Sequence, residues 1–185
     1  VKPRKNVLGV DINSKCFAVT VLSDKGKVLK QLYFGKDIWV KRKKIMERRS
    51  VLQSFADGGS AKAVRKLRKL KRKETDFVNN RIGEIVRDIR ILADKYDADI
   101  STENLKRFEA VARKVNREIM SIPFFKFKQV LMARCFDYGI PLNIIDAYHT
   151  SKWCPNCGAV LKNGHHSGNY SLFKCKCGLI VNSDR

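Results

Sequence analysis

Apolar and polar residues alternate in short blocks over the first part of the chain, a pattern typical of β-strands. The segments 7–12, 16–22 and 28–34 are rich in branched and aromatic side chains. The turn-forming sequence "SDKG" at 23–26 separates the second segment from the third. We therefore predict a meander of three antiparallel strands.

The pattern then changes to the spacing of helices. Residues 38–56 and 61–97 are predicted to be helical, with a break at Gly58 and Gly59. The second helix carries a narrow apolar stripe with steps of three and four residues, which favours packing on a partner helix. The stripe comprises Val78, Ile82, Ile85, Ile89, Leu92 and Tyr96.

Two further strands and one helix complete the regular pattern. We predict a strand over 98–102 that ends at Glu103, and another within "PLNIIDA" at 141–147. Between them, 121–139 is predicted to be a helix with Ser121 as its cap, Pro123 in its first turn and Gly139 at its end. Three antiparallel strands followed by βαβ units indicate a mixed α/β sheet flanked by helices.

The charge of the chain points to a polyanionic partner. There are 39 Lys and Arg against 18 Asp and Glu, a formal net charge of +21. The charged surface of a thermophilic protein is an alternative, but it would raise Lys and Glu together. A one-sided excess favours nucleic acid.

The run "RKLRKLKRK" concentrates this charge on a predicted helix. Such a run is often only a solvated surface, but with the global charge we favour contact with phosphates. The candidate nucleic-acid-binding residues are Arg65, Lys66, Arg68, Lys69, Lys71, Arg72 and Lys73, together with Lys152, Trp153, Lys174 and Lys176 near the cysteines.

The sequence has no apolar run of the roughly 18 residues that a membrane span needs, and no signal peptide opens it. We expect a cytoplasmic protein with no membrane partner. The oligomeric state is not readable from the sequence.

Four of the six cysteines form two closely spaced pairs, "CPNCG" and "CKCG". Tetrahedral coordination by Cys154, Cys157, Cys175 and Cys177 suits a structural zinc ion. A disulfide is one alternative, and replacement of one cysteine by His165 or His166 is another. Cys16 and Cys135 lie in apolar surroundings and are expected to fill the core.

Three carboxylates are candidates for a second metal site. Asp11 lies at the end of an apolar strand, Glu103 follows another strand, and Asp184 comes after the second cysteine pair. Parallel neighbouring strands would bring the first two to one sheet edge. Convergence of all three would require cations, as in phosphodiester nucleases that use two Mg²⁺ or Mn²⁺ ions. Alternatively, Asp11 caps a turn and Glu103 is an acid in the first turn of a helix.

The motifs "GVDIN", "ISTENL", "YHTSKWCPNCG" and "FKCKCGLIVNSDR" together resemble the C-terminal half of the TnpB (OrfB) family. These transposon-encoded, RNA-guided DNA endonucleases of prokaryotes are related to the type V CRISPR effectors. The resemblance implies a RuvC-like, RNase H-type mixed sheet flanked by helices, with an inserted zinc ribbon. It also implies that Asp11, Glu103 and Asp184 are the catalytic residues that hold two Mg²⁺ or Mn²⁺ ions.

The resemblance predicts three regions. Residues 1–147 would form the nuclease core with a basic helical insertion at about 38–97, residues 148–181 the zinc ribbon, and residues 182–185 the start of the last RuvC motif. The sequence departs from the family in three ways: the second pair is C-x-C-G rather than C-x-x-C-G, the chain stops at Arg185, and the RNA-binding N-terminal half is missing. We therefore expect a fragment, or a chain shortened by processing.

The implied function is cleavage of DNA under the direction of a guide RNA, in the cytoplasm near the nucleoid. A catalytically inactive zinc-ribbon protein that binds or regulates nucleic acid is the main alternative, and an autonomous resolvase or transposase is a further one. The presence of all three acids favours the nuclease.

Overall fold

The computed structural model describes residues 2–13, 15–104, 123–146, 152–160 and 172–182. The N-terminal meander consists of β1 (Asn6–Ile12), β2 (Phe17–Leu22) and β3 (Val28–Phe34). Two long helices follow, α1 (Lys36–Asp57) and α2 (Ala61–Lys95). The remaining elements are β4 (Ala98–Glu103), α4 (Phe124–Asp137), β5 (Leu142–Ile145), β6 (Leu172–Lys174) and β7 (Ile180–Asn182).

Five strands form one mixed sheet in the order β3-β2-β1-β4-β5. β1 and β2, like β2 and β3, pair antiparallel, whereas β4 pairs parallel with both β1 and β5. The predicted meander and the mixed sheet are therefore confirmed. β6 and β7 form a separate antiparallel pair.

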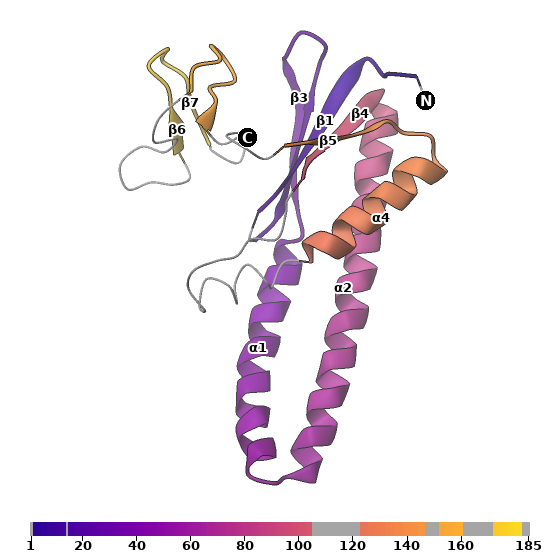
Figure 1. The fold of residues 1–185 in the computed structure, drawn as a ribbon, viewed down its shortest axis with the longest axis vertical. Helices are drawn as coiled ribbons and strands as arrows, with labels where there is room; N and C mark the ends of the chain where they lie inside the picture. Colours follow the sequence, from indigo (N-terminus) through magenta and orange to yellow (C-terminus); the bar gives the residue numbers. More distant parts are fainter. Residues whose placement is uncertain (1, 14, 105–122, 147–151, 161–171, 183–185) are drawn as a thin grey trace.

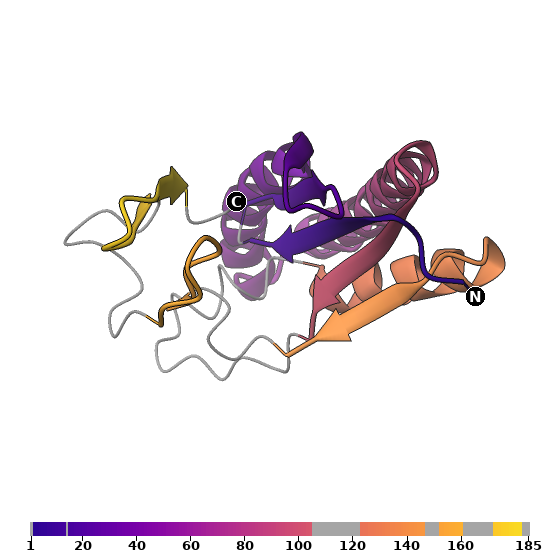
Figure 2. The ribbon, with the colours of Figure 1, turned by 90° about the horizontal axis from the view of Figure 1, so that it is seen from above.

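One face of the sheet is packed against α1, α2 and α4, which lie behind the strands in Figure 2. Alternate residues of β1 and β4 are buried on this face, among them Leu8, Val10 and Ile100. Ile82, Ile85 and Ile89 of α2 meet them and are fully buried. Burying one such side chain contributes about 1.5–3 kcal/mol. The apolar stripe of α2 thus packs on the sheet as well as on helices, which the sequence prediction of a partner helix did not anticipate.

α1 and α2 form a long antiparallel hairpin that extends away from the sheet (Figure 1). The 35 residues of α2 give it a length of about 50 Å. Glu74, only 8% exposed, accepts a hydrogen bond of 2.8 Å from Nε of Arg42 and lies 3.7 Å from Arg49. The Nζ atom of Lys41 lies 3.7 Å from the ring centroid of Phe77. These contacts link α1 to α2 midway along the hairpin.

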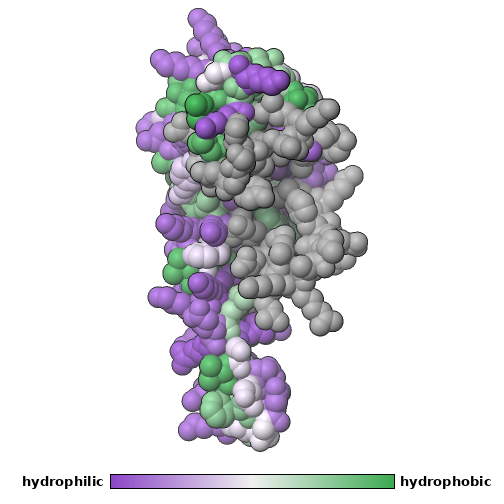
Figure 3. All heavy atoms as spheres, turned by 90° about the vertical axis from the view of Figure 1, so that its left-hand side faces the viewer, coloured by the Kyte–Doolittle hydropathy of each residue, from purple (hydrophilic) through white to green (hydrophobic). Residues whose placement is uncertain are grey.

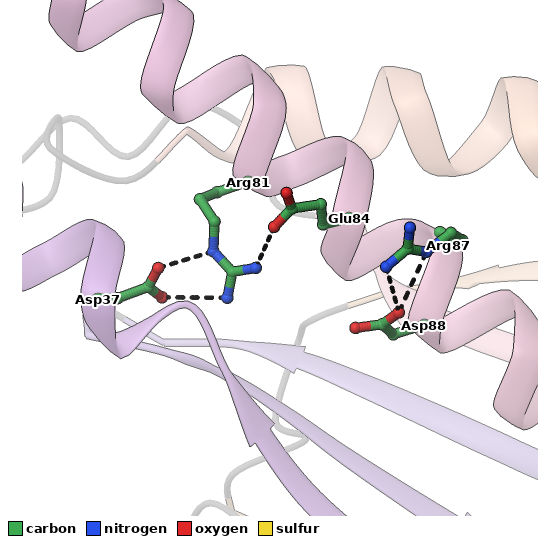
Figure 4. Close-up of polar contacts among 5 residues, drawn as sticks. All are labelled: Asp37, Arg81, Glu84, Arg87 and Asp88. Atoms are coloured by element: carbon green, nitrogen blue, oxygen red, sulfur yellow. Dashed lines mark hydrogen bonds and ion pairs between the residues drawn. The ribbon is translucent and has the colours of Figure 1, made fainter.

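The start of α1 is also fixed to α2. Arg81 of α2 donates hydrogen bonds to both carboxylate oxygens of Asp37, at 2.7 and 3.5 Å, and pairs with Glu84 on its own helix (Figure 4). Hydrogen bonds to these two acids raise the pKa of Arg81 above its ordinary value. A second contact on α2 joins Arg87 to Asp88 (Figure 4).

Several helix boundaries differ from the sequence prediction, including those of α1, which spans Lys36–Asp57 rather than 38–56. α2 ends at Lys95 rather than 97 because Asp97 adopts a left-handed conformation, with φ of 44°, that a helix cannot continue. Pro123 is not in the first turn of α4 but precedes it as the N-cap residue. Ser121, the predicted cap, lies outside the described residues. Gly139, with φ of 60°, follows the end of α4 as expected.

Among the helices that the structure describes, none combines the length and apolarity needed to cross a bilayer.

Gly35 makes the sharp connection from β3 into α1 possible. Its φ is 81°, and an added Cβ would lie 2.8 Å from Phe17 Cδ2. We expect Gly35→Ala to lower the free energy of unfolding by roughly 2–5 kcal/mol, from the left-handed backbone and from overpacking. Gly59→Ala is the matched control because its φ is 89° but nothing lies within 4 Å of the added atom. Urea denaturation should show a loss of about 1–2 kcal/mol for the control; equal losses would contradict the packing argument.

Candidate functional site

The parallel pairing of β1 with β4 places two acids side by side. The register ends with Val10 opposite Thr102, and Asp11 and Glu103 are the next residues on the two strands. Val10 and Thr102 are buried on the helix side, so strand alternation puts both acids on the opposite face, where each is half-buried. The structure thus brings Asp11 and Glu103 to the end of the sheet at which β1 and β4 finish, here called the carboxylate edge.

Hydrogen bonds hold the backbone and side chains at this edge. The buried hydroxyl of Thr102 donates to the carbonyl oxygen of Val10 at 3.2 Å, directly before the two acids. The side-chain amide of Asn13 donates to Oδ2 of Asp11 at 3.0 Å. Sequence reasoning missed Asn13, although a short amide two residues after a strand-end acid is a pattern that could have suggested it.

A cation from α4 reaches the same edge. Lys128 Nζ donates to the side-chain oxygen of Asn104 at 2.8 Å, and Asn104 follows Glu103 directly. The backbone N–H of Asn104 donates to the carbonyl oxygen of Ile145 at 2.7 Å, which extends the pairing with β5. Lys128 was not anticipated because only the fold brings α4 next to the end of β4.

The remaining acids near this edge are placed differently. Asp146 directly follows β5, whose last residue, Ile145, pairs with Glu103, and it is exposed. Asp184, the third predicted acid, lies outside the described residues. Within the described part of the chain, the carboxylate edge consists of Asp11 and Glu103, with Asn13 bound to the first of them.

The four cysteines of the two closely spaced pairs lie close together in space. Cys154 Sγ lies 3.7 Å from Cys177 Sγ, and Cys157 Sγ lies 3.6 Å from Cys175 Sγ. All four sulfur atoms are within 4.8 Å of one another. A tetrahedral zinc ion with Zn–S distances near 2.3 Å requires sulfur atoms about 3.8 Å apart. This arrangement can hold a zinc ion, and the sulfur separations are far beyond the roughly 2.05 Å of a disulfide bond.

The backbone explains how the shortened second pair still fits. In the first turn, the N–H of Gly158 donates to the carbonyl oxygen of Cys154 at 2.9 Å, four residues back. In the second turn, the N–H of Gly178 donates to Cys175, only three residues back, at 3.1 Å. Both glycines have positive φ, 70° and 89°, which allows each turn to close. A tighter turn therefore compensates for the missing residue.

Neighbouring hydrogen-bond donors favour the thiolate form of one of these cysteines, Cys177. The backbone N–H of Leu179 and the side-chain amide of Asn156 lower the pKa of the Cys177 thiol to about 6. Asn156 Nδ2 lies 3.6 Å from Cys177 Sγ. His165 and His166, the alternative ligands, lie outside the described residues.

The two cysteines that were expected in the core differ in burial. Burial raises the pKa of the Cys135 thiol to about 11, which fits its predicted place in the core. Cys16 is half-buried.

The predicted basic residues are on the surface. All seven candidates on α2 are exposed, and Figure 3 shows hydrophilic side chains along the hairpin, with apolar ones near its tip. Trp153, Lys174 and Lys176 are exposed around the cysteines, whereas Lys152 is half-buried. Residues 62–73 include eight cations and no acid, so they form a strongly positive surface.

Comparisons with known proteins relate this chain to one group. Residues 124–185 match the family model described as the Cas12f1-like TNB domain. A structure described as a CRISPR-Cas12f ternary complex has a TM-score of 0.73 at 22% identity, over 100% of this chain and 37% of the other. A structure described as a Cas12f1-sgRNA-target DNA complex has a TM-score of 0.72 at 20% identity, over 100% of this chain and 48% of the other. The chain is similar to the type V CRISPR effectors.

A more distant likeness belongs to the same group. The mini-RNA-guided endonuclease CRISPR-Cas_phi3 has a TM-score of 0.60 at 14% identity, over 98% of this chain and 43% of the other. No curated protein matches the chain. The chain spans about half or less of the length of these Cas12f and Cas_phi structures.

The family match covers the cysteine cluster, whereas only the structural likeness covers the two carboxylates. The Cas12f1-like segment contains α4, β5 and all four clustered cysteines. Asp11 and Glu103 lie outside it, on strands whose arrangement the structural likeness covers. The resemblance seen in the sequence, to relatives of the type V effectors, is confirmed, and so is a mixed α/β fold with helices like that of Cas12f.

Metal content tests the cysteine centre. We expect the purified chain to hold one zinc ion, and Cys154→Ala to lose it because three thiolates bind zinc more weakly than four. Cys16→Ala is the control, since Cys16 does not belong to the cluster. Elemental analysis of the two variants after dialysis measures the ratio of zinc to protein. A folded Cys154→Ala protein that keeps a full equivalent of zinc would refute the assignment.

Proposed function

We propose that this chain is the nuclease core of an RNA-guided DNA endonuclease of the TnpB and Cas12f kind. In this proposal the sheet and its helices form a RuvC-type nuclease domain at 1–147, which includes the basic hairpin at about 38–97. Residues 148–181 are a zinc ribbon, and 182–185 begin the last RuvC motif. The observation that supports it most is the position of Asp11 and Glu103, which directly follow the last paired residues of the parallel strands β1 and β4.

The residues at this edge fit hard divalent cations. Mg²⁺ and Mn²⁺ prefer oxygen ligands, and two half-buried carboxylates on adjacent strands supply them. Asp11 and Glu103 would hold the ions, with Asp184 as the third ligand. Such ions supply an activated water and neutralise the charge on the leaving oxygen.

The chain's own residues have supporting roles. The amide of Asn13 orients the Asp11 carboxylate through its 3.0 Å hydrogen bond. Lys128 holds the side chain of Asn104 next to Glu103. The four cysteines hold a structural zinc ion, and the exposed cations of α2 bind phosphates of DNA or of the guide RNA. Sequence choice would come from pairing with the guide RNA.

Loss of a carboxylate tests the nuclease. In the full-length protein, Asp11→Asn should reduce Mg²⁺-dependent DNA cleavage by more than about 100-fold, beyond the usual effect of losing a residue that only supports a metal ligand. DNA affinity should stay within a few fold, because a negative charge is removed rather than added. Asp24→Asn is the control, since Asp24 is exposed in the turn at the opposite end of the sheet. Undiminished cutting by Asp11→Asn would refute the catalytic role of Asp11, whereas DNA binding without any cutting by the unaltered protein would favour a nucleic-acid-binding protein without nuclease activity.

Salt dependence tests the basic surface of the hairpin. A double variant, Arg68→Gln with Lys71→Gln, should reduce the slope of log affinity against log salt by about 1.8 on duplex DNA, about 0.9 for each lost phosphate contact. Lys25→Gln with Lys27→Gln removes the same charge from the β2–β3 turn and should leave the slope nearly unchanged. Electrophoretic mobility assays at several salt concentrations measure both slopes. Equal reductions would show that only net charge matters.

A further inference from the structure

An aromatic side chain stands at the same end of the sheet as the two carboxylates. β3 ends at Phe34, which pairs with Phe17 at the start of β2, and β2 follows the short loop after β1. α1 begins directly after β3, and the backbone N–H of Trp39 donates to the carbonyl oxygen of Gly35 in its first turn. Figure 1 shows α1 starting where β1 and β3 end. Trp39 therefore belongs to the carboxylate end of the fold.

Two lysines face the ring of Trp39. Lys15 Nζ lies 5.3 Å and Lys43 Nζ 5.8 Å from its centroid. Both distances are near the outer limit of about 6 Å for a cation–π contact. By comparison, Lys41 lies only 3.7 Å from the ring of Phe77 between the two helices. The contacts of the two exposed lysines with the Trp39 ring are therefore weak, and both ammonium groups are available to bind an anion such as a phosphate.

Trp39 is not a member of the main core. It is half-buried, and among the described residues the partly buried apolar side chains that pack against that core do not include it. Its position is nevertheless fixed, because Asp37, two residues earlier, is bound by Arg81 of α2 (Figure 4). The start of α1 is therefore fixed, and it carries a half-buried ring with two lysines near it.

The surroundings connect this group to Asp11. Lys15 comes two residues after Asn13, whose amide binds the Asp11 carboxylate. Four residues of chain from Asp11 to Lys15 span at most about 14 Å. A DNA strand that has one phosphate at the carboxylates and runs towards α1 would pass within reach of Lys15 and of the ring beside it.

We infer that Trp39, Lys15 and Lys43 bind single-stranded DNA beside the carboxylate edge, an inference that rests on the proposed function. The indole ring stacks on an unpaired base, and the two ammonium groups contact the adjoining phosphates. A base inside a duplex is already stacked on its neighbours and offers no free face, so the group prefers a single strand.

Intrinsic fluorescence reports on this group directly. The chain has two tryptophans, so Trp153→Phe leaves Trp39 as the single indole. Without added divalent cations, oligothymidylate should quench the fluorescence of Trp153→Phe, and a duplex of equal length should quench it much less. The reciprocal variant, Trp39→Phe, measures separately the response of Trp153, a candidate nucleic-acid-binding residue beside the cysteines. Absence of quenching in Trp153→Phe at saturating single strand would overturn the inference.

Affinity gives a second readout. Trp39→Leu should weaken binding of oligothymidylate by about tenfold, within the range for loss of one base–aromatic stack, and duplex binding by less than twofold. Trp39→Phe keeps an aromatic face and should lose no more than about threefold. If Trp39→Leu fails to fold, Trp39→Phe and the fluorescence titration decide. Equal losses on single strand and duplex would contradict a stacking role.

The lysines are tested by their salt response. Lys15→Gln and Lys43→Gln should each reduce the single-strand salt slope by about 0.7, and Lys25→Gln at the far end of the sheet should not. These measurements need no cleavage, so they stay separate from the proposed nuclease. If Asp11→Asn still cuts DNA while oligothymidylate quenches Trp39, the metal-site proposal fails and the single-strand site stands. If Asp11→Asn abolishes cutting while Trp39 shows no quenching, the single-strand site fails and the metal-site proposal stands.

Discussion

The arrangement of the whole molecule depends on the parallel pairing of β1 with β4. These strands are far apart in the sequence, and β2, β3, α1 and α2 all lie between them in the chain. The register puts Asp11 next to Glu103 and at the same time puts Leu8, Val10 and Ile100 on the face covered by helices. A slip of one residue would exchange the two faces of the moved strand, which would bury an acid and expose an aliphatic side chain. The apolar core therefore selects the register that aligns the carboxylates.

Local patterns predicted much of this fold and several residues of its candidate sites. Strand alternation identified the meander, and cysteine spacing identified the four sulfurs that converge. The acids at 11 and 103 were singled out because each stands at the end of an apolar strand, and that position alone indicates a sheet edge. These features can be read from residues that are close in the chain.

Features that depend on contacts between distant segments could not be predicted in the same way. The stripe on α2 has the spacing of a helix partner, yet a sheet face and a helix can both accept it. Lys128 reaches Asn104 only because α4 crosses near the end of β4, and Trp39 had no sequence signal beyond being aromatic. The second cysteine turn also shows a limit of motif spacing, because a tighter hydrogen bond at Gly178 accommodates the missing residue.

The buried Glu74 separates the part of the helical hairpin that belongs to the main core from the part that lies outside it. On the sheet side of it, Val78, Ile82, Ile85, Val86 and Ile89 belong to the main core, together with Ile38 of α1. Beyond it, Ile45 and Ala63 are buried outside that core, and the tip exposes Val51 and Phe55. The outer part is therefore a modular extension: turns of helix could be added or removed there in matched pairs without disturbing the strands. The length of the α1–α2 hairpin can therefore change while the packing of its base against the sheet stays constant.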